Sequence, residues 1–79
     1  LDQADFRRQV KDALSAIEDP YRTIVILREI EDMTYQQIAA AREMPLNSVK
    51  VYLHRGRRML RERFLELENQ VPGGLAHES

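Results

Sequence analysis

The 79-residue chain has no cysteine and few of the residues that interrupt helices. Without cysteine, disulfide bonds and thiolate metal sites are excluded. No apolar run approaches the roughly 20 residues of a membrane-spanning helix, and no signal-peptide pattern is present. Only three glycines and three prolines occur, and no segment alternates apolar with polar residues as a half-buried strand would. These absences predict a small all-α domain that is cytoplasmic and not bound to a membrane.

A chain of this length forms one domain with a modest core. It begins at Leu1 rather than with methionine, so we expect a piece of a longer protein. The two histidines, His54 and His77, are far apart and have no obvious partner ligands, which predicts no metal site and no cofactor. The residues supply no nucleophile–base pair, no paired carboxylates and no phosphate-binding glycine loop. The sequence therefore predicts neither an enzyme nor a small-molecule substrate.

Charge is distributed unevenly along the chain. The net charge of −1 by itself argues against nucleic-acid binding. Residues 1–41, however, have five basic and eight acidic side chains, whereas residues 42–79 have seven basic and five acidic. Within residues 50–63 there are six basic side chains, and Glu62 is the single acidic one. This excess predicts a positive patch on an otherwise acidic molecule.

The spacing of apolar residues predicts four helices. The first runs from about Gln3 to Ile17, with an apolar stripe of Phe6, Val10, Leu14 and Ile17. Asp19 is a good N-cap for the second helix, which runs from about Pro20 to Glu31. That second helix is apolar on more than one side. Burial between its neighbours explains this pattern, and the alternative is that part of the surface binds a partner protein.

Thr34 and Gln37 have the spacing of a capping box and predict the start of a short third helix. Pro45 disfavours a helical conformation at the residue before it, so we expect a break there. Asn47 or Ser48 is then expected to cap the fourth helix.

The fourth helix is predicted to run to about Glu68, which gives a domain of residues 1–68. The pattern stops after Asn69, so residues 69–79 are expected to form a flexible tail.

On a helical wheel of about 100° per residue, the fourth helix has two distinct sides. Its apolar residues form one narrow stripe, comprising Val49, Leu53, Gly56, Leu60, Phe64 and Leu67. Its basic residues form an adjoining arc of Lys50, His54, Arg57, Arg58 and Arg61, which Val51 and Arg55 extend. We expect the stripe to pack against the other helices and the arc to face outward. Tyr52 and Met59 lie beside the stripe and are expected to pack rather than stack on bases.

A short helix, a tight break and a longer basic helix form a helix-turn-helix pattern. In that motif the second helix lies in the DNA major groove, with its N-terminal residues at the base edges. We therefore predict base contacts from Lys50, Val51, His54 and Arg55. We predict contacts to backbone phosphates from Asn47, Ser48, Arg57, Arg58 and Arg61. A solvated face is the alternative for Arg61 and Arg63, and a second alternative for Arg63 is pairing with a neighbouring glutamate along the helix.

Three segments resemble region 4 of bacterial sigma factors, most closely those of the extracytoplasmic-function group. They are residues 21–29 (YRTIVILRE), 33–39 (MTYQQIA) and 49–61 (VKVYLHRGRRMLR), and the likeness covers about residues 6–64. The LHRGRR run at residues 53–58 is a more specific part of it than the helix-turn-helix pattern.

This resemblance implies a sigma-factor domain that recognises the −35 element of promoters and docks on the β-subunit flap of RNA polymerase. It also implies possible sequestration by an anti-sigma factor. The apolar excess of the second helix, with Ile26 and Ile30, fits a contact with polymerase or with an anti-sigma factor. Promoter melting is not expected, since in this family another domain performs it.

The chain departs from the family pattern at several positions. Asn47-Ser48 replaces the common Gly-Thr before Val49, and Val51-Tyr52 replaces a frequent Ser-Arg pair. Glu43 stands where glycine is common in the turn, and Arg42 stands where an apolar residue is usual. The base preference is therefore open. Two alternatives are the helix-turn-helix of a response regulator or repressor, and a protein-interaction module that contacts DNA only incidentally.

Overall fold

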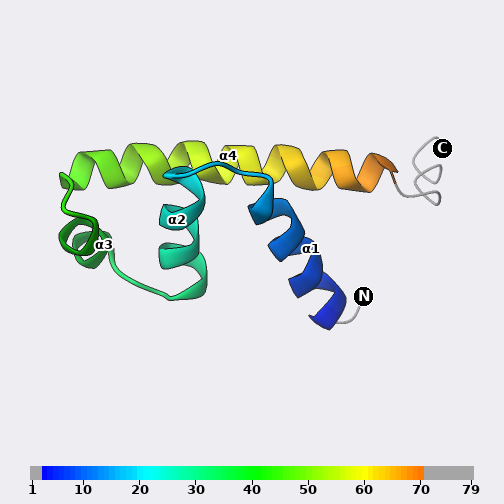
Figure 1. Ribbon diagram of the computed structural model, residues 1–79, viewed down its shortest axis with the longest axis horizontal. Helices are drawn as coiled ribbons and strands as arrows, with labels where there is room; N and C mark the ends of the chain where they lie inside the picture. Colours follow the sequence, from blue (N-terminus) through cyan, green and yellow to red (C-terminus); the bar gives the residue numbers. More distant parts are fainter. Residues whose placement is uncertain (1–2, 71–79) are drawn as a thin grey trace.

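The described part of the chain folds into four helices, and the long last helix lies across the other three (Figure 1). The computed structural model describes residues 3–70, and within this range it contains no strand. The order is α1 (Gln3–Ser15), then α2 (Tyr21–Val25) continuing into the π-helical η1 (Ile26–Ile30), then α3 (Tyr35–Arg42) and α4 (Leu46–Gln70). The predicted all-α architecture is confirmed.

α1 is shorter than the sequence predicted. It ends at Ser15 instead of Ile17, because the N–H groups of Ala16 and Ile17 bond to carbonyl oxygens three residues back, at 3.1 and 3.0 Å. Such bonds tighten the final turn and end the α-helical ladder. The predicted apolar stripe is only partly buried: Ile17 is 4% exposed, whereas Phe6, near the other end, is 54% exposed.

Asp19 holds the turn between α1 and α2. Its carboxylate accepts hydrogen bonds from the backbone N–H of Thr23 at 3.0 Å and from the guanidinium of Arg22 at 3.1 Å. Asp19 therefore satisfies a backbone N–H of the first turn of α2, but the N-cap residue is Pro20, so the prediction that Asp19 is the N-cap is wrong by one position. α2 itself begins at Tyr21, one residue after the predicted start at Pro20.

The second helix ends in a wider turn than an α-helix has. The N–H of Glu31 bonds to the carbonyl of Ile26, five residues back, at 3.0 Å, and the N–H of Met33 bonds to the carbonyl of Leu27 at 3.0 Å. Asp32 between them has a left-handed backbone, with φ of 58°. The sequence predicted a uniform α-helix here. The π-helical end satisfies the terminal carbonyl groups while the chain turns toward α3.

Contacts of η1 and a helix cap set the position of α3. Arg28 donates a hydrogen bond to the carbonyl of Met33 at 2.9 Å, and its guanidinium lies 5.4 Å from the ring centroid of Tyr35. The Thr34 hydroxyl accepts from the N–H of Gln37 at 3.0 Å, and the Gln37 side chain accepts from the N–H of Thr34 at 2.8 Å. The predicted capping box is therefore confirmed.

A left-handed residue turns the chain from α3 toward α4. Glu43 has φ of 53° and ψ of 53°. Its N–H bonds to the carbonyl of Ala40 at 3.3 Å, and the N–H of Met44 bonds to the carbonyl of Ala39 at 3.0 Å. This is the hydrogen-bond pattern of a Schellman motif, in which glycine is usual at the left-handed position. Glu43 therefore holds a backbone conformation that glycine adopts at lower cost.

α4 begins earlier than predicted. Its first residue is Leu46, and the carbonyl of Pro45 accepts from the N–H groups of Ser48 at 3.0 Å and Val49 at 3.3 Å. The prediction that Asn47 or Ser48 caps this helix is therefore wrong, because both lie inside its first turn.

α4 also continues to Gln70, past the predicted end at Glu68. The first two residues of the predicted tail, 69 and 70, are thus helical. Residues 71–79 lie outside the described residues.

The core lies where α4 crosses the other helices. It is formed by apolar side chains from all four: Leu14, Ile17, Ile24, Val25, Ile38, Val49 and Leu53. Tyr52 and Met59 are half-buried against this core, as the sequence predicted. Since α4 contacts each of the other helices, its rotation about its own axis is fixed.

The described part of the chain contains neither a membrane-spanning helix nor a cluster of metal-binding side chains. Across residues 3–70, no helix is both long enough and apolar enough to cross a membrane. Over the same span, His, Asp and Glu side chains form no group of three or more that could hold a metal ion. The longest helix, α4, is instead charged along its outer side.

Candidate nucleic-acid interface

The outward side of α4 presents the side chains that were predicted to read bases. Lys50, His54 and Arg55 are exposed, and Val51 is 44% exposed. The buried stripe of α4 lies on the opposite side and is clamped by the other helices. A rigid helix with its inner side fixed presents its outer side chains in a defined direction. Their contact with DNA bases stays a prediction.

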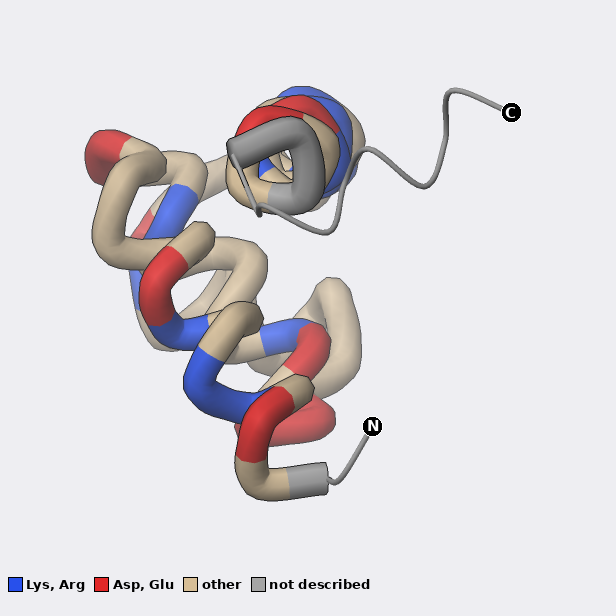
Figure 2. Tube along the Cα trace, turned by 90° about the vertical axis from the view of Figure 1, so that its right-hand side faces the viewer, with Lys and Arg blue, Asp and Glu red and all other residues tan. Residues whose placement is uncertain are grey.

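Positive charge is concentrated on this outer side. Figure 2 looks along the length of α4 and shows both Lys and Arg segments and, nearer the viewer, acidic segments on the side of the helix that faces away from the helices beneath. From residue 50 to residue 61, α4 contains no acidic residue. The helices beneath carry acidic and basic segments close together (Figure 2). Residues 50–61 of α4 therefore form a local positive patch although the net charge of the chain is −1.

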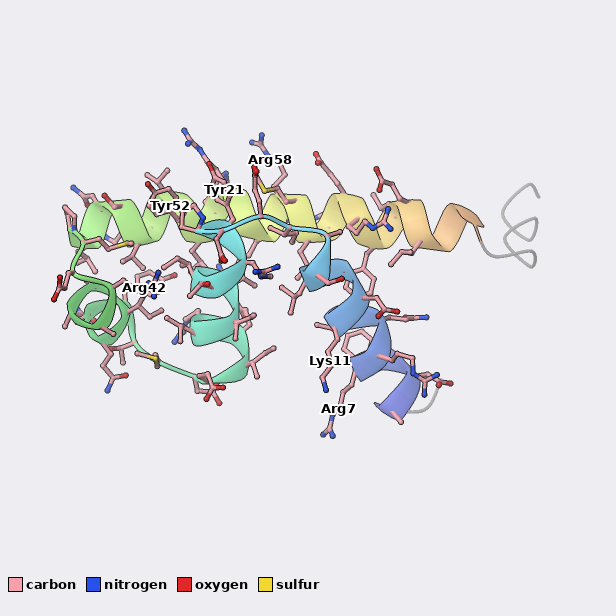
Figure 3. The ribbon with its side chains drawn as sticks, in the orientation of Figure 1. Arg7, Lys11, Tyr21, Arg42, Tyr52 and Arg58 are labelled. Atoms are coloured by element: carbon pink, nitrogen blue, oxygen red, sulfur yellow. The ribbon has the colours of Figure 1, made fainter. Side chains whose placement is uncertain are left out.

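Arg58 is fully available to a ligand on the outer side. Figure 3 shows it projecting from α4 away from the other three helices. It is exposed and forms no ion pair within the described part of the chain. Arg55, about one turn closer to the start of the helix, is also exposed and forms no ion pair among the described residues.

The first turn of α4 offers fewer backbone donors than expected. Asn47 is exposed, but Ser48 is half-buried and its N–H is bonded to the carbonyl of Pro45. The predicted phosphate contact at Ser48 must therefore come from its side chain. Asn47 keeps an exposed amide at the helix start, where the helix dipole favours an anion.

Arg57 differs from its neighbour Arg58. Its Nε donates a hydrogen bond to Oε2 of Glu29 at 2.7 Å, and a second guanidinium nitrogen lies against the same oxygen. Glu29 belongs to η1, so this ion pair ties α4 to the second helix. Both side chains remain about half exposed, at 46% and 42%. In the free domain, the Arg57 guanidinium that was predicted to contact a phosphate is already paired with the Glu29 carboxylate.

Further along α4, Arg63 forms the ion pair that was one of its two alternatives. Arg63 donates to Glu66 at 2.9 Å, three residues on. Arg61 is exposed and has no ion-pair partner among the described residues.

A groove runs between α1, η1 and the C-terminal half of α4. Its apolar lining comprises Phe6, Val10, Ile30, Leu60, Phe64 and Leu65, and its charged lining comprises Arg7, Lys11, Glu29, Arg57 and Arg61. Phe6 and Phe64 stack across it with ring centroids 6.2 Å apart and planes 16° apart. Figure 3 shows Arg7 and Lys11 extending from α1 on the side of η1. The groove is thus apolar at its base with four cationic side chains and one carboxylate around it.

The two residues predicted to bind a partner protein lie in different environments. Ile26 is half-buried and packs against the core. Ile30 is 51% exposed and lines the groove. Ile30 is therefore the more exposed of the two, and Ile26 is only partly accessible.

Sequence reasoning missed most of this groove. Phe6 was assigned to the core because its spacing continues the stripe of α1, yet α1 diverges from the core toward its start. Arg7 and Lys11 gave no signal, since charged residues on a helix are usually solvated. The pairing of Glu29 with Arg57 joins residues 28 positions apart, which no local pattern encodes.

One known protein family matches most of the chain. The model of a family described as "Sigma-70, region 4" matches residues 7–60. This match covers α2, η1, α3, most of α1 and the part of α4 that carries the exposed cationic residues.

Curated relatives agree with the family match. The chain is 34% identical over 65 residues to the RNA polymerase sigma factor CarQ of Myxococcus xanthus, covering 82% of this chain and 37% of the relative. It is 29% identical over 58 residues to the ECF RNA polymerase sigma factor SigW of Bacillus subtilis, covering 73% and 31%. It is 36% identical over 50 residues to the ECF RNA polymerase sigma factor SigE of Mycolicibacterium smegmatis, covering 63% and 20%.

The chain therefore spans little more than a third of the length of these relatives, or less. The comparison with solved structures gave no significant match.

Proposed function

Since the chain belongs to the sigma-70 region 4 family, we propose that it binds the −35 element of promoter DNA and so directs RNA polymerase to its promoters. The observation that carries this proposal is the outward side of α4, where exposed Lys50, His54 and Arg55 stand on a helix clamped along its other side. This is the geometry that a recognition helix needs in the major groove.

Affinity and specificity come from different residues in this proposal. Arg58 and Arg61 neutralise phosphates, which strengthens binding to any sequence. Lys50 and Arg55, nearer the start of α4, donate to acceptor atoms on base edges, guanine above all. Val51 has no donor, and contacts a thymine methyl group. The domain carries out no catalytic step, and acts in the cytoplasm where polymerase and chromosome are found.

The second partner in the proposal is the RNA polymerase core, at the flap of its β subunit. The groove between α1, η1 and α4 supports this, because its exposed Phe6, Ile30 and Leu65 would be covered by a bound protein segment. A soluble domain gains free energy when such a surface is covered. An anti-sigma factor that occupied the same groove would exclude polymerase.

DNA binding is tested by titrating labelled 30-base-pair duplexes at salt concentrations from 50 to 200 mM. We expect binding that weakens steeply with salt, with a slope of log K against log[salt] of roughly −3 to −5 for four or five phosphate contacts. The double variant R55Q/R58Q removes two charges from the outer side of α4 and should weaken binding at least tenfold. The matched control R7Q/K11Q removes two charges from the groove and should retain most of the binding.

The groove also favours a second candidate, a module whose main ligand is a protein. In that case R55Q/R58Q and R7Q/K11Q would affect DNA equally and weakly, while R7Q/K11Q and I30S would weaken binding to purified polymerase core. Strong loss of DNA binding in R55Q/R58Q alone would decide for the proposed function.

A further inference from the structure

The ion pair between Arg57 and Glu29 is unlike the other ion pairs of the described residues. The others join residues three positions apart: Asp5 with Arg8, Asp19 with Arg22, and Arg63 with Glu66. Arg57 and Glu29 instead join two helices, through a hydrogen bond of 2.7 Å from Nε to Oε2. The pair is not sealed in the core, since both side chains are about half exposed (46% and 42%). Solvent and ligands can therefore reach it.

Arg57 lies on the same row of α4 as the residues proposed to contact DNA. Residues at intervals of four and three fall on one side of an α-helix, which aligns Lys50, His54, Arg57 and Arg61. A duplex that met the first two would present further phosphates along this row. Three of the four side chains are free of ion pairs within residues 4–67, and Arg57 alone is held by a carboxylate.

We infer that Glu29 restrains DNA binding by holding Arg57, and that Arg57 exchanges from Glu29 to a phosphate when the domain binds a duplex. This rests on the proposed function of α4. A half-exposed ion pair is weak, because water screens it and two long side chains must be ordered to form it. A DNA phosphate carries a full negative charge, and its contact with a cationic side chain releases counterions that are condensed on the DNA. It therefore competes effectively with Glu29 for Arg57. Glu29 therefore lowers the affinity for every sequence equally and leaves the sequence preference unchanged.

The test is a double-mutant cycle on the 79-residue chain with one random-sequence duplex. The proteins are wild type, E29Q, R57Q and E29Q/R57Q, and the control is E31Q. Glu31 is exposed, lies two residues from Glu29 and forms no ion pair with any side chain that the structure describes. E31Q changes the net charge by the same amount as E29Q. We expect E29Q to bind about three- to tenfold more tightly than wild type at 50 mM salt, and E31Q to bind less than twofold more tightly. In the R57Q background, E29Q should have no more effect than E31Q has.

Equal effects of E29Q with and without Arg57 would overturn the inference, because Glu29 would then act only by general repulsion. So would an effect of E29Q no larger than that of E31Q. If the wild-type chain bound no duplex at all, the proposed function itself would fail, and this outcome is distinct from a missing coupling.

A second measurement does not depend on the variants folding. The Nε–Hε signal of Arg57 in NMR spectra reports the bond to Glu29. We expect this signal to move when a duplex is added, while the Nε–Hε signal of Arg63, whose Nη1 donates to Glu66, stays in place. An unchanged Arg57 signal in the DNA complex would show that the pair is only structural, and would overturn the exchange.

Discussion

Gly56 of α4 lies directly against Val25 of α2, and the two helices approach closely at this point. A Cβ atom placed on Gly56 would lie 2.5 Å from Cγ2 of Val25 and 3.2 Å from the backbone carbonyl oxygen of Tyr21. Both Val25 and Gly56 are buried. The absence of a side chain at Gly56 is therefore what lets α4 dock at this depth, and hence what sets the orientation of its outer side.

We predict that G56A destabilises the domain by about 1–3 kcal/mol, although alanine is the better helix former by roughly 1 kcal/mol. The added methyl group forces apart two packed helices, and this overpacking outweighs the propensity gain. Urea unfolding followed by circular dichroism measures the difference. V25A is the matched partner, because it removes the methyl group that the new Cβ atom would meet. G56A should therefore reduce the free energy of unfolding by less in the V25A background than in the wild type. Strictly additive effects would contradict the close approach.

The left-handed turn at Glu43 gives a second stability prediction. The left-handed conformation destabilises a non-glycine residue by roughly 1–2 kcal/mol. Glycine avoids this cost, but part of the gain is offset because glycine loses more conformational freedom on folding. E43G should therefore stabilise the domain by about 0.5–1 kcal/mol, measured as a higher urea midpoint. E43A is the control, because it removes the same side chain but keeps the Cβ atom. A midpoint for E43G at or below that of E43A would argue against the left-handed backbone.

Asp19 predicts how stability depends on pH. Hydrogen bonds from the side chain and backbone N–H of Thr23 lower the pKa of Asp19 below its usual 3.8, and Arg22 adds to this. Since the folded pKa lies below the unfolded one, the ionised carboxylate stabilises the fold above pH 3.8, and this contribution is lost as the pH falls through the folded pKa. NMR titration should give Asp19 a midpoint below 3.8. The thermal unfolding midpoint of D19N should be nearer to that of the wild type in strong acid than at pH 6. The midpoint of D12N, a variant of an exposed residue, should differ little from that of the wild type at either pH. A titration midpoint of Asp19 at or above 3.8 would contradict these hydrogen bonds.

Arg58 tests the division between affinity and specificity. R58Q should weaken binding to every duplex by a similar factor, and the slope of log K against log[salt] should become shallower by about 0.9, the value for one phosphate contact. R8Q removes the same charge from α1, where Arg8 is exposed, and should leave that slope almost unchanged. Anisotropy titrations with two unrelated duplexes measure both. A change in which duplex is preferred would show that Arg58 reads bases instead.

Features encoded by neighbouring residues were predictable from the sequence. The capping box of Thr34 and Gln37 and the hydrogen bond from the N–H of Thr23 to Asp19 form over three or four positions, so their residue types suffice to indicate them. Helical periodicity also predicted the buried part of the α4 stripe, Val49, Leu53 and Gly56, whereas Leu60, Phe64 and Leu67 farther along the same stripe are only half-buried. The start of α4 was misplaced because Asn47 and Ser48 are good capping residues, and nothing local shows that Leu46 is already helical.

Features set by the angles between helices were not predictable. Phe6 has the spacing of a core residue, but α1 diverges from the core, so its ring instead stacks on Phe64 in the groove. Glu29 meets Arg57 only because the second helix packs against α4 through α2. Both depend on tertiary packing between segments far apart in the sequence.

The central claim is that the start of α4 reads base sequence, and selection from a library of random duplexes tests it most directly. The 79-residue chain is incubated with the library at moderate salt, and the bound duplexes are sequenced. We predict that one short motif is enriched, that K50A and R55A each alter it at particular positions, and that R58Q leaves it unchanged. Enrichment of no motif by the wild-type chain, or the same motif from K50A and R55A, would contradict the claim.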